Sequence, residues 1–495
     1  MACTSRHTMT STTATAATRQ ITDLPGPRGI PVLGNLLQVR LARIHLDVEK
    51  WGREYGPLFR FRLGKTDVLG ITDHELIASV LKDRPDGFRR TARSFEIGKE
   101  MGLMPGLFSS EGQAWRDQRR MVMASFAPGH VRSYFPSLLK VSQRLHKRWL
   151  QAARSGSTIA LQADLMRYTV DGVAGLAFGT DMNTLESDEE VIQQHLDKIF
   201  PAMFRRIFSP FPYWRWLRLP ADRALDRSVV AITQAIEGFI ASARQRLGAD
   251  PTLREHPANL LEAMIATTDE GDSGVDDEQV AGNVVTMLLA GEDTTANTLA
   301  WMVYLLQRNP QALQRATDEV LRLAPDPAAF TPEQMASLDY LEACASETMR
   351  LKPVAPFLPL EALRDTTLAG VHVPARSLVW CVLRHDSIAD THFPNAAAFE
   401  PERWLDTADA QPHAGSPKRV AMPFGAGPRV CPGRYLALLE IKMAMAMLLG
   451  SFEIESVLTA DGSEPREHMA FSMGPVGLSL RLRERHTENA APHAG

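Results

Sequence analysis

The chain has 495 residues, of which 44% are apolar and 23% charged, and its formal net charge is −4. This composition is typical of a globular protein with a large core and excludes a disordered, fibrous or collagenous chain. The basic residues are scattered rather than gathered into one block, which argues against nucleic-acid binding. The four cysteines, Cys3, Cys344, Cys381 and Cys431, lack the paired spacing of a zinc site or disulfide framework, so we expect a reduced, intracellular protein.

The N-terminal segment, residues 1–22, is rich in Ser, Thr and Ala and contains no apolar run of signal-peptide or membrane-anchor length. We predict a flexible tail here. Arg6 and Arg19 precede the first acidic residue, Asp23, so an organelle transit peptide remains an alternative. Closely spaced prolines and glycines over residues 24–35 then predict an extended entry into one folded domain, residues 23–495.

Most of this domain has the apolar spacing of helices, with strand-like segments near each end and no internal repeat or linker. Residues 59–73 alternate and turn at glycines, which predicts a β-hairpin. We therefore predict a single α+β domain that is mainly α. Predicted helices cover residues 73–84, 138–153, 228–247 and 277–307. Besides the hairpin, predicted strands lie within residues 367–383 and 477–485.

The long helix predicted to end at Asn309-Pro310 carries an unusual run, AGEDTTA, between two apolar flanks. About thirty residues make a rod of roughly 45 Å, long enough to cross the molecule. Acids and hydroxyls in the middle of such a helix are costly to bury without partners. A kink with threonine back-bonding, or a solvated patch, is the ordinary interpretation of the run alone. Its small residues are Ala290 and Gly291, and its polar residues are Glu292, Asp293, Thr294 and Thr295.

A Glu-x-x-Arg pair, Glu347 and Arg350, lies on another predicted helix that is otherwise apolar and ends at Lys352-Pro353. Residues three apart share one helix face, so the two side chains can bond to each other. Most such pairs are surface features of little energetic weight. The apolar context instead predicts a buried structural network, which Arg403 can join from a segment about fifty residues further on.

The stretch FGAGPRVCPG, residues 424–433, places Cys431 in a rigid Gly/Pro loop directly before a helix-forming run. Backbone N–H groups at a helix N-terminus favour a thiolate, and Arg429 adds a cation two residues away. Gly425, Gly427 and Gly433 leave room for something flat and bulky. The alternative is an ordinary buried cysteine in front of a buried helix.

These motifs together resemble the cytochrome P450 haem-thiolate superfamily, and the resemblance runs from about Leu24 to the last strands. The cysteine-loop pattern, Phe-x-x-Gly-x-Arg-x-Cys-x-Gly, is complete and is the most specific of the motifs. The small-Gly-x-acid-Thr-Thr, Glu-x-x-Arg, Pro-Glu-Arg and Trp-x-x-x-Arg patterns follow the same order and spacing. The residues that match are Trp115, Arg119, Ala290, Gly291, Asp293, Thr294, Thr295, Glu347, Arg350, Arg403, Phe424, Gly427, Arg429, Cys431 and Gly433.

The resemblance implies a cytochrome P450 fold, with a long central helix over haem b (iron protoporphyrin IX) and small β-sheets near the termini. Cys431 would be the proximal axial ligand of the iron, and so the metal ligand. Trp115, Arg119 and Arg429 would hold the haem propionates. Asp293 and Thr294, with Glu292 beside them, would relay protons to the reacting oxygen. Phe424, Gly425, Ala290 and Gly291 complete the expected cofactor-binding set.

One departure from the family pattern concerns the segment PVAPFLPLEAL, which contains no basic residue where many relatives have another propionate partner. By rough alignment, that position is near Leu360. The familiar His-Arg-Asp order of the next strand also differs, because it reads Arg384-His385-Asp386 here. We expect Arg384 or His385 to substitute for the absent partner.

The resemblance also implies an apolar, sulfur-rich substrate pocket. Each of its predicted residues has an alternative as ordinary core. The aromatic and arginine-rich residues 199–220 fall in the expected lid, with contact to a membrane surface as the less favoured alternative. The predicted pocket residues are Phe95, Met101, Leu103, Met104, Leu107, Phe108, Val285, Leu289, Val354, Phe357, Phe471 and Met473.

Electrons must come from elsewhere, because the chain has no dinucleotide-binding fingerprint and no cysteine cluster for an iron–sulfur centre. A ferredoxin or flavodoxin-like protein with its NAD(P)H reductase is the implied donor, and O₂ the oxidant. Basic residues near the presumed thiolate face suit an acidic partner, although an ordinary solvated charged face is the alternative. These residues are Arg116, Arg119, Arg120, Lys418, Arg419 and Arg434.

The expected activity is that of a haem-thiolate monooxygenase of the EC 1.14 type, which hydroxylates or epoxidises an apolar substrate. A haem-thiolate peroxygenase or isomerase that needs no reductase is the main alternative, but such relatives usually lose the acid-Thr pair that is intact here. A helical binding protein without haem is a second alternative, which the intact Cys431 loop disfavours. The absence of an anchor in the sequence leads us to expect a cytoplasmic, bacterial protein with no membrane anchor.

Overall fold

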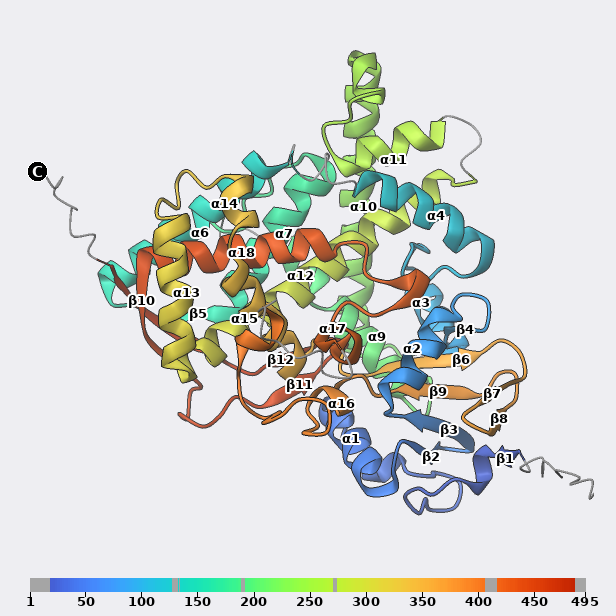
Figure 1. Ribbon diagram of the computed structural model, residues 1–495. Coiled ribbons are helices and arrows are strands. Elements are labelled where there is room, and N and C mark those ends of the chain that lie inside the picture. The colour runs from blue at the N-terminus through green and yellow to red at the C-terminus, as the bar shows by residue number, and fades with distance from the viewer. Residues whose placement is uncertain are drawn as a thin grey trace, which may run out of the picture.

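The computed structural model describes residues 18–126, 132, 134–187, 192–269, 274–405 and 416–485. Helices dominate, and the small sheets involve segments from near both ends of the chain, so the predicted fold class is confirmed. Figure 1 shows the largest sheet at one side of the molecule, with the helical body beside it.

The helices and strands have the following bounds. The α-helices are α1 Ile44–Tyr55, α2 His74–Lys82, α3 Ala92–Glu100, α4 Gly112–Ser125, α6 Phe135–Ser155, α7 Leu161–Phe178, α8 Ile192–Leu196, α9 Ile199–Phe208, α10 Pro220–Ala249, α11 Leu260–Asp269, α12 Asp277–Arg308, α13 Pro310–Leu323, α14 Pro332–Ala336, α15 Asp339–Leu351, α16 Arg384–Ser387, α17 Pro417–Ala421 and α18 Arg434–Ser451. The strands are β1 Arg19–Gln20, β2 Leu58–Leu63, β3 Thr66–Ile71, β4 Phe88–Arg90, β5 Ile159–Ala160, β6 Leu358–Ala362, β7 Thr366–Leu368, β8 Val371–Val373, β9 Leu378–Cys381, β10 Phe452–Leu458, β11 Glu467–Met469, β12 Met473–Pro475 and β13 Ser479–Glu484.

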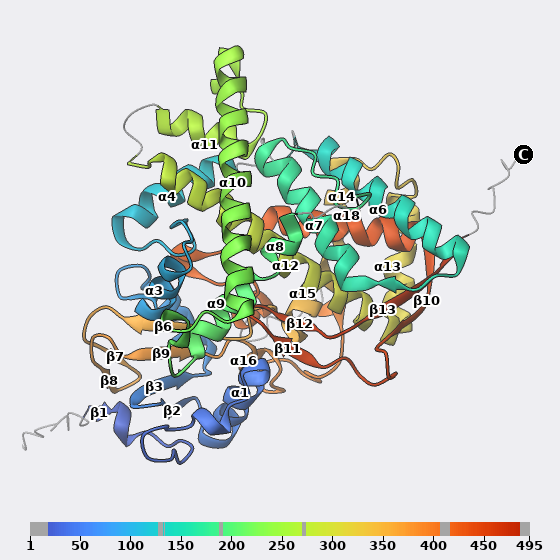
Figure 2. The ribbon, with the colours of Figure 1, turned by 180° about the vertical axis from the view of Figure 1, so that it is seen from behind.

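The long helix α12 forms the axis of the helical body. It begins at a capping box, in which Asp276 accepts a hydrogen bond from the backbone of Gln279 and the Gln279 side chain accepts one from the backbone of Asp276. It ends where Pro310 starts the next helix. It contacts α7 extensively and also packs against α10, α15 and α18. In Figures 1 and 2, α12 lies within the body between α18 and α10. Its middle is therefore held between other helices.

The five-stranded sheet has the order β2-β3-β9-β6-β4 and joins segments far apart in the sequence. The predicted hairpin is β2 and β3, which turn at Gly64 with a φ of +63°. Strand β3 pairs in parallel with β9, whereas β6 is antiparallel to both β9 and β4. In this last pairing Arg90 lies opposite Leu360. The register thus places an arginine beside the position where the sequence lacks a cation.

The last residues of the predicted tail, residues 1–22, contain secondary structure. Arg19 and Gln20 form β1, which pairs in parallel with β8, and Ile21 is buried. The rest of the predicted tail, residues 1–17, lies outside the described residues. Among the helices that the structure describes, none has the length and apolar character needed to span a membrane.

Candidate active site

The loop before α18 is held in a tight conformation that presents Cys431. The backbone N–H of Cys431 donates to the carbonyl of Phe424 at 3.0 Å, which closes the loop. Gly425 and Gly427 have φ values of +74° and +69°, a region that side chains rarely adopt. A Cβ on Gly427 would lie 2.3 Å from the carbonyl oxygen of Leu81 at the end of α2, whereas one on Gly425 would meet no atom within 4 Å. Gly427 is thus needed for packing, whereas Gly425 leaves an open face.

The Cys431 side chain is exposed, yet the surrounding protein removes much of its hydration. This burial raises the pKa of the thiol above its ordinary value. The backbone N–H of Gly433 and the cations Arg119 and Arg434 act in the opposite direction but do not outweigh it. The loop alone therefore does not favour the thiolate, contrary to our expectation, whereas coordination to a metal cation deprotonates a thiol outright.

The three predicted propionate-binding residues lie around this loop. Trp115 is buried, and the Arg429 guanidinium lies 4.7 Å from the centre of its ring. Arg119 donates through Nη2 to the carbonyl of Val430 at 2.8 Å. Arg429 donates through Nη2 to the carbonyl of Ser110 at 2.5 Å and pairs with the Glu111 carboxylate. Burial lowers the pKa of Arg429 to about 10, although Glu111 opposes the shift.

Two further arginines, Arg84 and Arg90, join these cations, and the sequence analysis missed both. Burial lowers the pKa of each, most strongly at Arg90, whose charge also meets those of Arg84 and Arg429. Arg84 has no hydrogen-bond partner at Nε or Nη2, and Arg429 has none at Nε, among the residues that the structure describes. Glu111 is the acid that acts on these cations. The only indication of Arg90 in the sequence is the missing basic residue near Leu360, because Arg90 lies opposite Leu360 in the sheet.

Arg384 and His385, which we expected to substitute for a cation near Leu360, bond elsewhere. Both Nε and Nη2 of Arg384 donate to Glu49, and its Nη1 donates to Glu467 at 2.9 Å. His385 bonds through Nδ1 to Asp386 at 2.9 Å. That expectation is therefore wrong, because acidic partners hold both side chains, and Arg90 is the better candidate.

The AGEDTTA run divides between two faces of α12. Ala290 is exposed in the middle of this otherwise buried helix and lines a cavity, while Thr294 donates through Oγ1 to the Ala290 carbonyl at 2.7 Å. Gly291 faces α7 instead, since a Cβ there would lie 2.6 Å from Cγ2 of Val173. The absence of a side chain at Gly291 is thus used for helix packing, and only Ala290 opens the helix to the cavity.

Asp293 is held by side chains from α12 and from the turn between β11 and β12. Asn297 donates through Nδ2 to Oδ1 of Asp293 at 2.8 Å, and the Ser472 hydroxyl donates to Oδ2. Gln162 donates in turn to Asn297 at 3.1 Å. Burial raises the pKa of Asp293, while the bonds from Ser472 and Asn297 limit the rise. Asp293 is thus an oriented carboxyl that can take up and release a proton.

Glu292 is a second, more deeply buried carboxyl with an acidic neighbour. Burial raises its pKa well above the ordinary value, and the charges of Asp197 and Asp293 add to the shift. It shares a hydrogen bond with Asp197, and its Oε1 has no partner among the described residues. Desolvation raises the pKa of Asp197 to about 6, although part of that residue is exposed. The two carboxyls therefore connect the surface with the interior beside Asp293.

A cavity of about 310 Å³ lies between α3, α9 and α12. The predicted residues that line it are Phe95, Leu103, Met104, Phe108, Val285 and Leu289, with Ala290 from the cofactor set. The remaining lining residues were not predicted individually, because no motif marks them. These are Ser94, Gly98, Lys99, Pro105, Ser109, Phe200, Met203, Glu278 and Thr286. The wall is mainly apolar, with one lysine and one glutamate among its members.

The remaining predicted pocket residues lie outside this lining. Phe471 stacks on Phe200 with ring centres 4.2 Å apart, so it touches the lining rather than forming it. Phe357 stacks on Trp380 within a core cluster that also contains Met473. The backbone of Val354 accepts a hydrogen bond from Met473. Leu107 and Met101 belong to the main core. Met101, Leu107, Phe357 and Met473 are therefore core residues in this structure.

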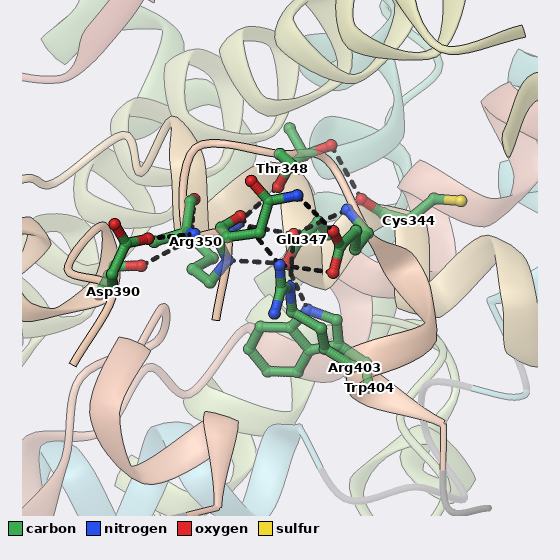
Figure 3. A network of polar contacts seen from close by, with 12 residues as sticks. Cys344, Glu347, Thr348, Arg350, Asp390, Arg403 and Trp404 are labelled. Carbon is green, nitrogen blue, oxygen red and sulfur yellow. Dashed lines mark hydrogen bonds and ion pairs between the residues drawn. The ribbon is translucent and has the colours of Figure 1, made fainter. Parts of the chain in front are cut away.

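The structure brings Glu347, Arg350 and Arg403 together in a buried network (Figure 3). Arg350 donates to both carboxylate oxygens of Glu347, at 2.7 and 2.8 Å, and both of these side chains are fully buried. Its other donors reach the carbonyls of Ser387, Ala396 and Ala398. Trp404 and the backbone of Glu400 donate to Glu347, and Arg403 pairs with it at 3.5 Å. The network links α15 to the segment that contains Pro401–Trp404.

The chain matches the cytochrome P450 family over residues 24–482. It belongs to this family. Cytochrome P450 3A6 of Oryctolagus cuniculus is 24% identical to it, with 87% of this chain and 86% of the relative aligned. A bifunctional cytochrome P450/NADPH–P450 reductase of Gibberella moniliformis is 25% identical, and the aligned region covers 95% of this chain but only 41% of the fusion protein. The crystal structure of the cytochrome P450DA heme domain superposes with a TM-score of 0.80 at 24% identity, covering 94% of this chain and 98% of that one.

This cytochrome P450 is accordingly a haem-thiolate oxidoreductase of the monooxygenase class, which uses haem, O₂ and an electron donor. Its residues fit the cofactor. Arg84 and Arg429 offer buried N–H donors, unpaired among the described residues, for propionate carboxylates, and Gly425 leaves open space in the loop that carries Cys431. Haem, once bound, supplies the oxidising chemistry, with the thiolate ligand favouring O–O cleavage.

Proposed function

We propose that this cytochrome P450 inserts one oxygen atom of O₂ into a small apolar substrate bound in the 310 Å³ cavity. The observation that carries the proposal is the position of the acid-Thr pair. Thr294 bonds to Ala290, which lines the cavity, and Asp293 next to it is a half-buried, oriented carboxyl. A carboxyl and a hydroxyl beside the substrate cavity suit controlled proton delivery, which a monooxygenase needs. Trp115, Arg84, Arg90, Arg119 and Arg429 would hold the propionates and Cys431 the iron.

The proposed path for protons continues outward from Asp293. Glu292 is its neighbour in the chain, and Glu292 shares a hydrogen bond with the partly exposed Asp197. Each of the three carboxyls has a raised pKa, so each can hold a proton closer to neutral pH than an ordinary acid. We assign Asp293 and Thr294 the inner positions of the path and Glu292 with Asp197 the outer ones.

The proposed electron donor is an acidic ferredoxin or flavodoxin-like protein. Lys418, Arg419 and Arg434 are exposed beside the cysteine loop, and none of them has an ion pair among the described residues. Two of them border a surface cavity of about 420 Å³ that Phe424, Gly425 and Tyr435 also line. By contrast, Arg116 is paired with Asp86 and Arg120 with Asp117. These two arginines therefore offer less unpaired positive charge to a partner. Opposite charge on a partner would orient it toward this loop.

Spectroscopy and turnover test this function. Reduced protein treated with carbon monoxide should show a Soret band at the thiolate-specific position, and Cys431→Ser should abolish it. Apolar compounds should then shift the haem spectrum by displacing water. With a ferredoxin and its reductase, Asp293→Asn should slow product formation by about 100-fold or more, while peroxide-driven turnover falls much less, because peroxide already carries its protons and electrons.

Two results would contradict the proposal. Absence of the thiolate-type band in the wild-type protein would remove the haem-thiolate site altogether. Turnover with peroxide alone, together with no turnover on O₂ and the donor system, would instead identify a peroxygenase.

A further inference from the structure

A histidine cluster lies on the surface side of the fold, apart from the two cavities described above. His74 is the first residue of α2, Asp386 belongs to α16, and His392 follows in the loop after α16. None of the three lines either cavity. Asp386 is buried, whereas His74 is half-buried and His392 exposed, so the cluster is accessible from one side. The haem-thiolate chemistry makes no use of these side chains.

The cluster has the dimensions of a metal site. Nδ1 of His74 lies 2.9 Å and Nε2 of His392 lies 3.4 Å from the same oxygen, Oδ2 of Asp386. The three atoms all lie within 4.8 Å of one another. Zinc binds imidazole nitrogen and carboxylate oxygen at about 2.0–2.2 Å, which places two ligands of a tetrahedral ion roughly 3.3 Å apart. The ligand atoms therefore need only small movements to surround one ion.

Neighbouring groups fix the carboxylate at the centre of the cluster. His385 bonds through Nδ1 to the other oxygen, Oδ1 of Asp386, at 2.9 Å. The backbone N–H of His74 donates to Oδ2 at 3.0 Å, which ties α2 to α16. The two outer rings, His74 and His392, meet edge to face with centres 4.7 Å apart. Such supporting bonds orient metal ligands in known sites.

The turn that carries His392 is also held by its backbone. Ala389 donates to the carbonyl of Asp386 at 3.2 Å, and His392 donates to the carbonyl of Ala389 at 3.0 Å. On the other side, Asp73 caps α2 by accepting a bond from the backbone of Leu76. All three ligand residues thus come from segments with fixed backbones, so little ordering is needed on binding.

We propose that Nδ1 of His74, Oδ2 of Asp386 and Nε2 of His392 bind one divalent transition-metal ion, with zinc as the best match. Two imidazoles and one carboxylate suit zinc, and the exposed side leaves a fourth position for water. The ion replaces the proton that the His74–Asp386 bond holds. It also cross-links the start of α2 to the turn after α16, and α2 contacts the Gly427–Arg429 segment of the cysteine loop.

Zinc titration tests this site. The sample is the haem-loaded full chain, which carries no affinity tag and is pretreated with a chelator. Calorimetry should give one ion per chain, and zinc should raise the melting temperature. His392→Ala should weaken binding at least about 10-fold, and so should Asp386→Asn, which keeps a hydrogen-bonding side chain in place. His256→Ala removes another exposed histidine outside the cluster and should leave the affinity unchanged.

The reverse pattern would overturn the assignment. If wild-type protein binds less than a fifth of an equivalent at zinc concentrations that saturate ordinary sites, the cluster is a hydrogen-bonded one only. Wild-type affinity in both His392→Ala and Asp386→Asn, or an equal loss in His256→Ala, would place bound zinc elsewhere on the chain. Spectral titration with carbon monoxide confirms in each sample that the haem site is intact.

Discussion

The arginines around Glu347 and those around Cys431 have their charges compensated differently. In the first region, Arg350 donates to Glu347 and to three carbonyls, with both charged side chains at zero exposure. In the second, Arg84, Arg90 and Arg429 share Glu111 as their acid, and Arg84 keeps two donors that have no partner among the described residues. Burying an unpaired cation is costly.

The comparison separates two uses of a buried charge. The network of Glu347 is complete within the protein, so it stabilises one arrangement of the chain and is available to nothing else. Burial lowers the pKa values of the cations near Cys431, and their incomplete pairing leaves donors for an anion. The two haem propionates would supply the negative charge that this region lacks. A surplus of buried charge is thus a better marker of a ligand site than a buried charge alone.

Breaking the complete network should have the largest effect on stability. Arg350→Met removes one partner and leaves Glu347 buried without its cation, which should cost about 3–5 kcal/mol in the free energy of unfolding. Urea unfolding measured with and without haem checks this value. The control is Arg315→Met, which removes an exposed pair with Glu402 and should cost no more than about 1 kcal/mol. Equal losses in the two variants would contradict the assignment of the network.

Removing an incomplete cation should act on haem rather than on folding. Arg84→Met should speed haem transfer to a scavenger protein by about 10- to 100-fold, as expected for one or more lost charge-assisted bonds of roughly 1.5–3 kcal/mol. The stability of the haem-free protein should stay the same or rise, since an unpaired buried charge is lost. Arg89→Met gives the opposite pattern, because Arg89 is paired with the buried Glu361. Unchanged haem transfer in Arg84→Met would show that this cation has another role.

Glu292 extends the comparison to surplus negative charge. Its folded-state pKa lies above its unfolded value, so its contribution to stability is complete below about pH 4 and is lost as pH rises through the folded pKa. The glutamine side chain in Glu292→Gln does not ionise. The variant should therefore gain on the wild type by up to about 1.4 kcal/mol per pH unit between the unfolded and the folded pKa of Glu292, and the difference should become constant above the folded pKa. Thermal unfolding from pH 5 to 8 checks the trend, and a constant difference across this range would contradict it.

Exposed charges near the loop should give the smallest effect. Lys418→Glu should slow reduction by an acidic ferredoxin a few-fold at low ionic strength, with the difference vanishing as salt is added. Stopped-flow reduction measures the rate. Lys65→Glu, in the exposed β2–β3 turn, is the matched control and should reduce at the wild-type rate. A salt-independent effect would mean that Lys418 acts other than by long-range attraction.

The sequence predicts those parts of the site that follow from local spacing. Glu347 and Arg350 are three residues apart on one helix, and Cys431 lies in a loop whose glycines are visible in the letters. Arg90 was missed because its place depends on pairing with Leu360, about 270 residues away, and strand register over such a distance has no local signal.

Helix faces and tertiary burial explain the other differences. Gly291 was predicted to contact the cofactor because it has no side chain to prevent a close approach. The rotation of α12 instead turns Gly291 toward Val173. Phe357 and Met473 are as apolar as true lining residues, and only packing against Trp380 decides their place in the core. Asp197 lies in an unremarkable stretch of sequence and gains significance from its bond to Glu292. Composition and spacing contain none of this information.

Phe471 and Ser472 are adjacent in the sequence but contact different parts of the site. Phe471 has a φ of +107°, a strained value for a phenylalanine, and stacks on Phe200 at the cavity, while Ser472 bonds to Asp293. One short turn therefore connects the shape of the cavity to Asp293, the carboxyl that we propose as a proton donor. Redesign at Phe471 for a bulkier substrate would also shift this hydrogen bond, and more reducing equivalents would then be lost as peroxide or water. In such a program, product yield per NAD(P)H consumed is a more informative screen than rate.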